Sequence, residues 1–97
     1  MPNVEVSQWD LAAGTAPLAG EGASMRQVFV KAGYISARHS HEHEQFLLVL
    51  SGSARLECET GAVPLQPGTA IRFAPGAWHS AEFVADTVLL ELNLATG

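Results

Sequence analysis

Residues 38–45 read Arg-His-Ser-His-Glu-His-Glu-Gln and contain three of the four histidines in the 97-residue chain. Side chains alternate between the two faces of an extended strand, so the residues at positions 39, 41, 43 and 45 share one face if this segment is extended. Imidazole nitrogens bind Zn, Fe, Ni, Cu and Mn, and an amide or carboxylate oxygen can complete such a site. The segment therefore predicts a site for one divalent transition metal.

Several residues of this segment compete for the ligand positions. His39 and His41 are the first candidates, and Gln45 on the same face is the third. Glu44 can replace Gln45 only if the strand register shifts by one residue, which would turn its neighbours to the wrong face. His43 has the parity of a ligand, but a bend can turn it out of the site, where it is the one candidate for a general acid or base. The choice between Gln45 and Glu44 stays open.

The fourth histidine, His79, lies far along the chain from this segment. It follows residues 74–78, Ala-Pro-Gly-Ala-Trp, which predict a tight turn that returns the chain to a strand. A barrel places strands that are distant in sequence side by side, so it can bring His79 to the pair His39 and His41. We expect His79 to be a further metal ligand.

The chain beyond residue 24 has an all-β pattern. Short apolar or alternating segments separated by glycine, proline and serine turns indicate a sandwich or barrel. The predicted strands are Met25–Ala32, Glu44–Ser51, Ala54–Glu59, Thr69–Ala74, His79–Val84 and Thr87–Leu94. We expect residues 25–97 to form one β-barrel domain.

Residues 1–24 are less regular, and we expect an N-terminal arm with one short strand or turn over residues 4–11. Charged residues make up only 15% of the chain, against about 25% in typical soluble domains. Such a chain has few polar groups to cover its surface, which suggests a homodimer interface, with a low-charge monomer as the alternative. We expect Trp9 and Leu11 in the arm to pack on the neighbouring chain.

The composition argues against several classes of protein. The net charge of −5 disfavours binding to nucleic acid or to an anionic membrane, because both require a basic face. The single cysteine, Cys58, excludes an internal disulfide and fits a buried apolar position. The first residues lack the basic and apolar regions of a signal peptide, so the expected location is the cytoplasm.

The first histidine block resembles the first sequence motif of the cupin superfamily. That motif has a glycine, five residues, His-x-His, three or four residues, a glutamate, six residues and a second glycine. The matching residues of this chain are Gly33, His39, His41, Gln45 and Gly52. The single departure is Gln45, where glutamate is commonest.

The segment around His79 is similar to the second cupin motif. That motif has a glycine, five residues, Pro-x-Gly, two residues, a histidine, three residues and an asparagine. The corresponding positions are occupied by Gly68, Ala74, Gly76, His79 and Phe83. Ala74 replaces the proline, which is shifted to Pro75, and Phe83 replaces an asparagine that is not a metal ligand in the family.

The resemblance implies a single cupin barrel, of the jelly-roll or double-stranded β-helix type, with an N-terminal arm. It implies one Mn, Fe, Ni or Zn ion on His39, His41, Gln45 and His79. The ligand run also resembles small cupins with a glutamine ligand, one group of which opens the ring of unsaturated uronates.

Four neutral ligands leave the ion its full charge, which favours redox-neutral Lewis-acid chemistry. We therefore expect an isomerase, lyase or ring-opening enzyme that acts on a small anionic or carbonyl-bearing substrate, such as a sugar acid. A non-catalytic metal-binding or ligand-binding sensor module is one alternative, and a non-haem Fe(II) oxygenase is another.

Overall fold

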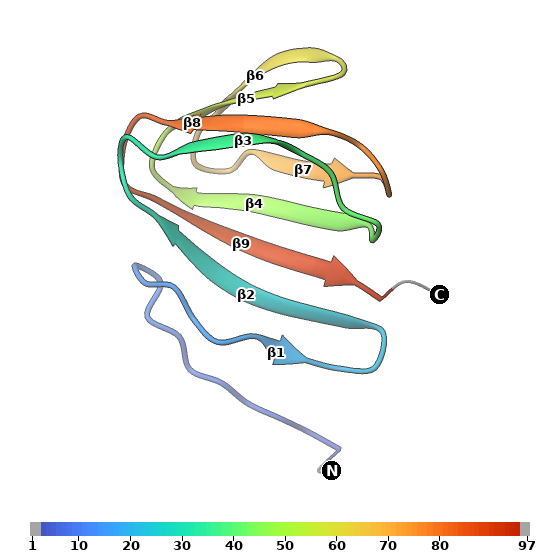
Figure 1. The fold of residues 1–97 in the computed structure, drawn as a ribbon. Coiled ribbons are helices and arrows are strands. Elements are labelled where there is room, and N and C mark those ends of the chain that lie inside the picture. The colour runs from blue at the N-terminus through green and yellow to red at the C-terminus, as the bar shows by residue number, and fades with distance from the viewer. Residues whose placement is uncertain (1–2, 96–97) are drawn as a thin grey trace.

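The structure is a computed structural model that describes residues 3–95, which form two facing antiparallel β-sheets (Figure 1). The five-stranded sheet has the order β1 (Leu18–Ala19), β2 (Ala23–Val30), β9 (Thr87–Leu94), β4 (Gln45–Ser51) and β7 (Ala70–Phe73). The four-stranded sheet has the order β3 (Ile35–His39), β8 (His79–Phe83), β5 (Ala54–Cys58) and β6 (Gly61–Leu65). The chain passes repeatedly from one sheet to the other, as in a jelly roll, and the all-β prediction is confirmed. Among these residues, no helix is long and apolar enough to span a membrane.

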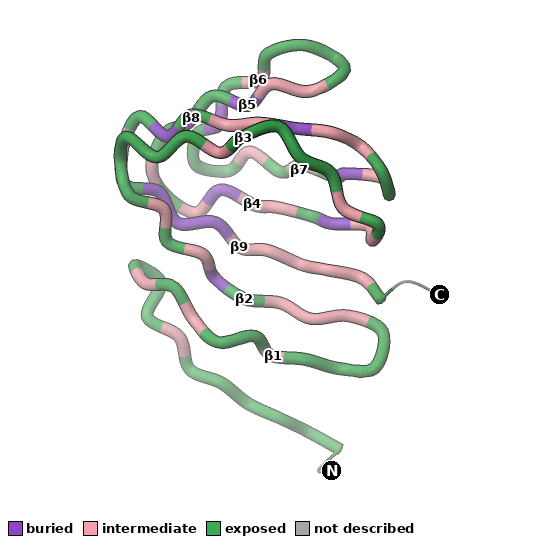
Figure 2. Tube along the Cα trace, viewed as in Figure 1, coloured by how far each residue is buried: buried purple, intermediate pink, exposed green. Residues whose placement is uncertain are grey.

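The core lies between the two sheets and takes side chains from both. Val49 of β4 and Leu89 of β9 are register partners that face inward, whereas Leu48 and Leu90 beside them face outward. Buried residues accordingly occur on strands of both sheets (Figure 2). Burying a large apolar side chain stabilises a fold by about 1.5–3 kcal/mol. The core cluster consists of Val49, Ala54, Leu56, Leu65, Phe73, Phe83 and Leu89.

The sequence predicts six of the nine strands that the described residues form, with ends within two residues of those observed. The missed strands β1 and β6 lack a clear alternation of apolar and polar residues, and the short alternation at the start of β3 places its apolar residues on the exposed face. β3 is largely exposed, and β1 has only two residues. β6 contains Pro64, which this position tolerates because β6 is the edge strand of its sheet.

Side-chain hydrogen bonds from Gln27 of β2 hold the N-terminal arm against the five-stranded sheet. The Gln27 side chain is only 2% exposed, and its Nε2 donates to the carbonyl oxygens of Asp10 at 2.7 Å and Ala13 at 2.9 Å. Of the strand or turn expected over residues 4–11, the structure shows a turn at the end of that range, closed by a bond from Ala13 N to Asp10 O. The predicted division after residue 24 falls inside β2, because the five-stranded sheet begins in the arm at β1.

Gly52 connects β4 to β5 at a point where no side chain fits. Its φ is +101°, a backbone conformation that favours glycine. A Cβ atom there would lie 2.3 Å from Thr87 Oγ1 and 2.5 Å from Asp86 O. Thr87 is fully buried, and its hydroxyl donates to Ala85 O at 2.9 Å, so it has no room to move aside. Glycine is therefore required here, because the connection between β4 and β5 passes directly against the first residue of β9, Thr87.

Gly52→Ala is expected to destabilise the protein by about 2–5 kcal/mol, because it combines an unfavourable φ with a steric overlap. Gly68→Ala is the matched control: Gly68 has a φ of +90°, but its Cβ would meet nothing within 4 Å. This second change should cost only about 1–2 kcal/mol. Urea unfolding of both variants measures the difference, and equal destabilisation would contradict the packing argument.

Candidate metal centre

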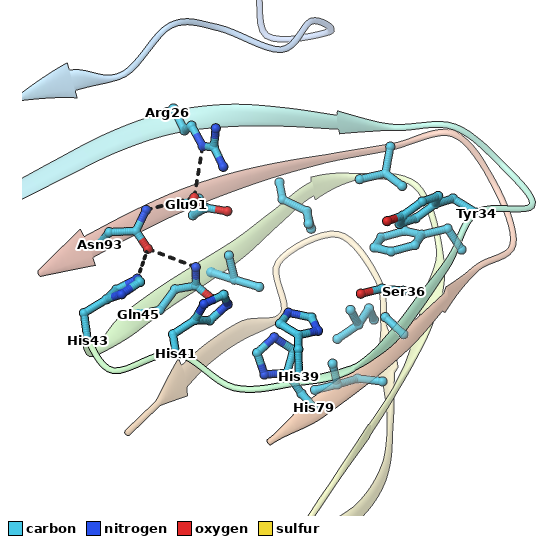
Figure 3. A pocket seen from close by; sticks show the side chains of 17 residues that line it. Arg26, Tyr34, Ser36, His39, His41, His43, Gln45, His79, Glu91 and Asn93 are labelled. Carbon is cyan, nitrogen blue, oxygen red and sulfur yellow. Dashed lines mark hydrogen bonds and ion pairs between the residues drawn. The ribbon is translucent and has the colours of Figure 1, made fainter. Parts of the chain in front are cut away.

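A cavity of about 410 Å³ lies between the two sheets, near the end of β3 and the start of β8 (Figure 3). Apolar side chains of the core, including Leu56, Phe83 and Leu89, form part of its wall. The remaining wall is polar and includes every residue that the sequence predicts for the site: His39, His41, His43, Gln45 and His79.

Strand pairing brings the distant histidines together. His39 of β3 and His79 of β8 are register partners, and their ring centroids lie 4.2 Å apart. His41 follows in the next loop, with its ring centroid 5.0 Å from that of His39 and 5.6 Å from that of His79. One ring nitrogen of each histidine lies within 4.8 Å of the others, so the three residues can hold a metal ion.

The loop that carries His41 is bonded to the turn that precedes His79. Gly76 N donates to His41 O at 2.7 Å, and the turn itself is closed by Ala77 N donating to Ala74 O at 3.0 Å. Gly76 has a φ of +81°, which the turn requires. Pro75 therefore makes the turn expected from the sequence, although it is one position later than in the cupin motif.

The free ring nitrogens fit a metal ligand set. His39 Nδ1 lies 2.7 Å from Ala37 O, and since a carbonyl only accepts, His39 carries its proton on Nδ1 and its lone pair on Nε2. His79 is 6% exposed, stacks on Phe73 at 4.1 Å, and has a buried Nδ1 without a hydrogen-bond partner among the described residues. The His79 ring is therefore free to bind an ion or ligand.

The cluster favours neutral imidazoles. Burial lowers the pKa of His79 below its ordinary value, and the neighbouring His39 and His41 lower it further, while the Ala77 backbone opposes the shift. Burial also lowers the pKa of His41, together with His39 and His43, while Glu91 opposes this shift. Because a metal ion binds only the unprotonated ring, both shifts keep ligand nitrogens available near neutral pH.

Gln45, and not Glu44, faces the cavity. Gln45 is 5% exposed, and its Nε2 donates to Asn93 Oδ1 at 2.9 Å. Its amide oxygen is turned toward His41 (Figure 3). Glu44 is the adjacent residue on the opposite face and forms an ion pair with Arg72. The register shift that would make Glu44 a ligand is therefore absent from this fold.

His43 lines the same cavity with its ring centroid 5.1 Å from that of His41, but it lies outside the cluster that the other three histidines form. Its Nε2 lies 2.8 Å from Asn93 Oδ1, on the far side of Gln45 from His79 (Figure 3). The group of possible metal-binding residues contains His39, His41 and His79 and does not include His43. His43 thus borders the histidine cluster, and its role as a general acid or base stays a prediction.

Sequence reasoning missed several polar residues of the cavity wall, namely Tyr34, Ser36 and the hydrogen-bonded group of Arg26, Glu91 and Asn93. Glu91 and Asn93 have the same parity on β9 as the core residue Leu89, so both point inward from a strand that is otherwise mostly apolar. Two polar residues on the inward face of an apolar strand are the signal that could have identified them.

Acidification should destabilise the metal-free protein as the pH falls below about 6.5, the ordinary histidine pKa. The unfolded chain takes up protons on His41 and His79 in that range, whereas the folded chain resists them because both pKa values are lowered. Stability is therefore full above that pH and declines below it. Urea midpoints measured across this range should fall less steeply for His41→Gln than for the wild type, and identical slopes would contradict the assignment.

Residues 25–93 match the family model described as the cupin domain. None of the curated proteins matches the sequence. Among solved structures, a cupin protein from Bacteroides fragilis has a TM-score of 0.80 at 24% identity, covering 100% of this chain and 88% of its own. KdgF from Halomonas sp. has a TM-score of 0.75 at 24% identity, with 84% of this chain and 79% of its own chain covered.

A third similar structure is the DMSP lyase DddQ from Ruegeria pomeroyi, with a TM-score of 0.73 at 22% identity. The match covers 82% of this chain and 45% of the lyase chain. At these identities the structural matches establish the fold alone. The family match spans both histidine motifs and most of the described strands, and it confirms the resemblance seen in the sequence. The chain belongs to the cupin family.

Proposed function

We propose that this cupin holds one divalent transition-metal ion, Mn, Fe, Ni or Zn, on His39, His41, Gln45 and His79. The observation that carries the proposal is the convergence of three histidine nitrogens to within 4.8 Å in a cavity. Gln45 supports it as the buried neighbour that can add an oxygen ligand. The proposed set of protein ligands is entirely neutral.

We further propose redox-neutral chemistry on a small anionic or carbonyl-bearing molecule, such as a sugar acid. A divalent ion on neutral ligands keeps its full charge and polarises a carbonyl or carboxylate group. The nearby charges of Arg26 and Glu91 form an ion pair at 3.0 Å and offset each other, so the pair adds little net charge to the cavity. An anionic substrate is therefore favoured.

The chain itself supplies a candidate proton-transfer group, His43, and an apolar lining on part of the cavity. Because Asn93 Oδ1 accepts, a neutral His43 donates through Nε2 and keeps its lone pair on Nδ1, where it can accept a substrate proton. The apolar wall limits the entry of water, and a volume of about 410 Å³ suits a small molecule. These features support an isomerase, lyase or ring-opening reaction, and the DMSP lyase from Ruegeria pomeroyi is a similarly folded protein with an activity of that class.

Reconstitution with Mn, Fe, Ni or Zn is expected to give about one equivalent of metal per chain for at least one of these ions. His39→Ala combined with His41→Ala should abolish binding, because it removes two of the three clustered nitrogens. His43→Ala is the control and should retain the metal. Elemental analysis after desalting measures all three, and a full equivalent on the double variant would refute the site.

The metal-loaded protein should then be screened for turnover of unsaturated uronates and small keto or hydroxy acids, with oxygen uptake recorded in parallel. Turnover that needs the metal but consumes no oxygen supports the proposal. Oxygen consumption coupled to substrate would instead establish an Fe(II) oxygenase. Metal binding without turnover of any substrate would favour the sensor or binding module.

We also propose that two copies form a homodimer through apolar surface on the arm and on the outer face of the five-stranded sheet. Val6 is 87% exposed and Leu11 is 70% exposed on the arm. The outer face of the sheet carries an apolar groove lined by Phe46, Leu48, Leu90 and Leu92. Pairing of two copies would cover both surfaces, which a chain with few charges has reason to bury.

Light scattering at tens of micromolar protein is expected to give twice the 10.3 kDa monomer mass. Val6→Asp combined with Leu11→Asp should yield the monomer, because it places charges in the proposed interface. Val84→Asp is the matched control, since Val84 is 69% exposed on another part of the molecule and should leave the dimer intact. A monomer mass for the wild type would reject the assembly.

A further inference from the structure

A chain of hydrogen bonds runs along the polar wall of the cavity and ends at Gln45 (Figure 3). Arg26 Nε lies 3.0 Å from Glu91 Oε1, and Asn93 Nδ2 lies 2.8 Å from the same carboxylate oxygen. Asn93 Oδ1 then accepts from Gln45 Nε2 at 2.9 Å and lies 2.8 Å from His43 Nε2. The chain thus connects β2 through β9 to β4.

Donor and acceptor chemistry fixes the direction of every bond in this chain. The Arg26 guanidinium only donates, and the Glu91 carboxylate only accepts. Asn93 must therefore turn its NH₂ group toward Glu91, which leaves Oδ1 facing Gln45. An oxygen that faces Gln45 accepts from its NH₂ group, so the Gln45 amide can point only its oxygen toward the histidines.

We propose that Glu91 and Asn93 are positioning residues that set the orientation of the Gln45 amide and so determine that a ligand oxygen enters the site. The inference rests on the metal site proposed above. Neither residue needs to touch the ion for this role. A reversed amide would present an NH₂ group, which cannot bind a cation, and three ligands would remain.

A simpler role for Glu91 would be to attract the cation through its negative charge. The two roles differ in the variant Gln45→Glu. The carboxylate that this change introduces cannot donate, so Asn93 must turn its NH₂ group toward position 45 and its oxygen toward Glu91, where two acceptors oppose each other. Glu91→Gln relieves that conflict, because an amide at position 91 can donate to Asn93, and a neutral His43 can accept through Nε2.

The test is a double-mutant cycle on divalent metal affinity, measured by calorimetric titration with Zn or Ni for the wild type, Gln45→Glu, Glu91→Gln and the double variant. With the native Gln45, Glu91→Gln should weaken binding about tenfold, the lower end of effects seen for groups that orient metal ligands. In the Gln45→Glu background, the same change should tighten binding. Loss of the Arg26 ion pair is common to both backgrounds and cancels.

Each result of the cycle bears on the proposal. A reversal of sign between the two backgrounds supports it. Weakening in both backgrounds would show that Glu91 acts only through its charge, and no effect in either would show that the bond chain is inert toward Gln45. A wild type that binds no metal would overturn the proposed site itself and the inference with it, so the two failures are distinguishable.

Asn93→Leu gives an independent measurement that changes no charge and serves if Glu91→Gln fails to fold. It removes both the acceptor for Gln45 and the donor to Glu91. Metal binding should weaken about tenfold with the native Gln45, whose amide is then free to reverse. In the Gln45→Glu background it should not weaken binding, because the two oxygens of a carboxylate are equivalent and no amide orientation remains to be set. Equal losses in both backgrounds would assign Asn93 a merely structural role.

Discussion

The antiparallel pairing of β3 with β8 is the constraint on which the site depends. It makes His39 and His79 register partners, although they lie 40 residues apart in the sequence. The register is irregular between Ser36 and His39, and such irregularities commonly re-aim side chains beside functional sites. His41 lies two residues beyond His39, and the hydrogen bond from Gly76 N to His41 O holds its loop against the turn that precedes His79.

The histidine cluster is also in direct contact with the hydrophobic core. Phe73 belongs to the core cluster and stacks on the His79 ring at 4.1 Å, which fixes the plane of that imidazole. Cys58 is the register partner of His79 on its other side. A ligand held by packed neighbours loses little freedom when it binds, which is how a small barrel can prepare a site in advance.

Prediction from sequence succeeded where periodicity or spacing carried the information. Short apolar or alternating segments between turns located six of the strands, and the spacing of the two histidine motifs predicted the cluster. β3 could not be predicted, because an exposed strand needs no apolar pattern, and the role of Asn93 depends on which atoms of Gln45 and Glu91 it meets. Orientation of an amide is a property of three-dimensional neighbours, and no local sequence pattern encodes it.

In the proposed metal site, the polar wall explains how a neutral ligand set selects a cation. A buried amide is symmetric in shape, so packing alone cannot choose between its oxygen and its nitrogen. The choice requires a neighbour of fixed polarity, and a carboxylate paired with arginine is such a neighbour at physiological pH. Glu91 fulfils this condition two residues away from Asn93 on the same strand face. The Glu91 charge that sets the orientation of Gln45 is balanced by Arg26 and is separated from Gln45 by Asn93. The proposed ion therefore keeps its full electrophilic strength.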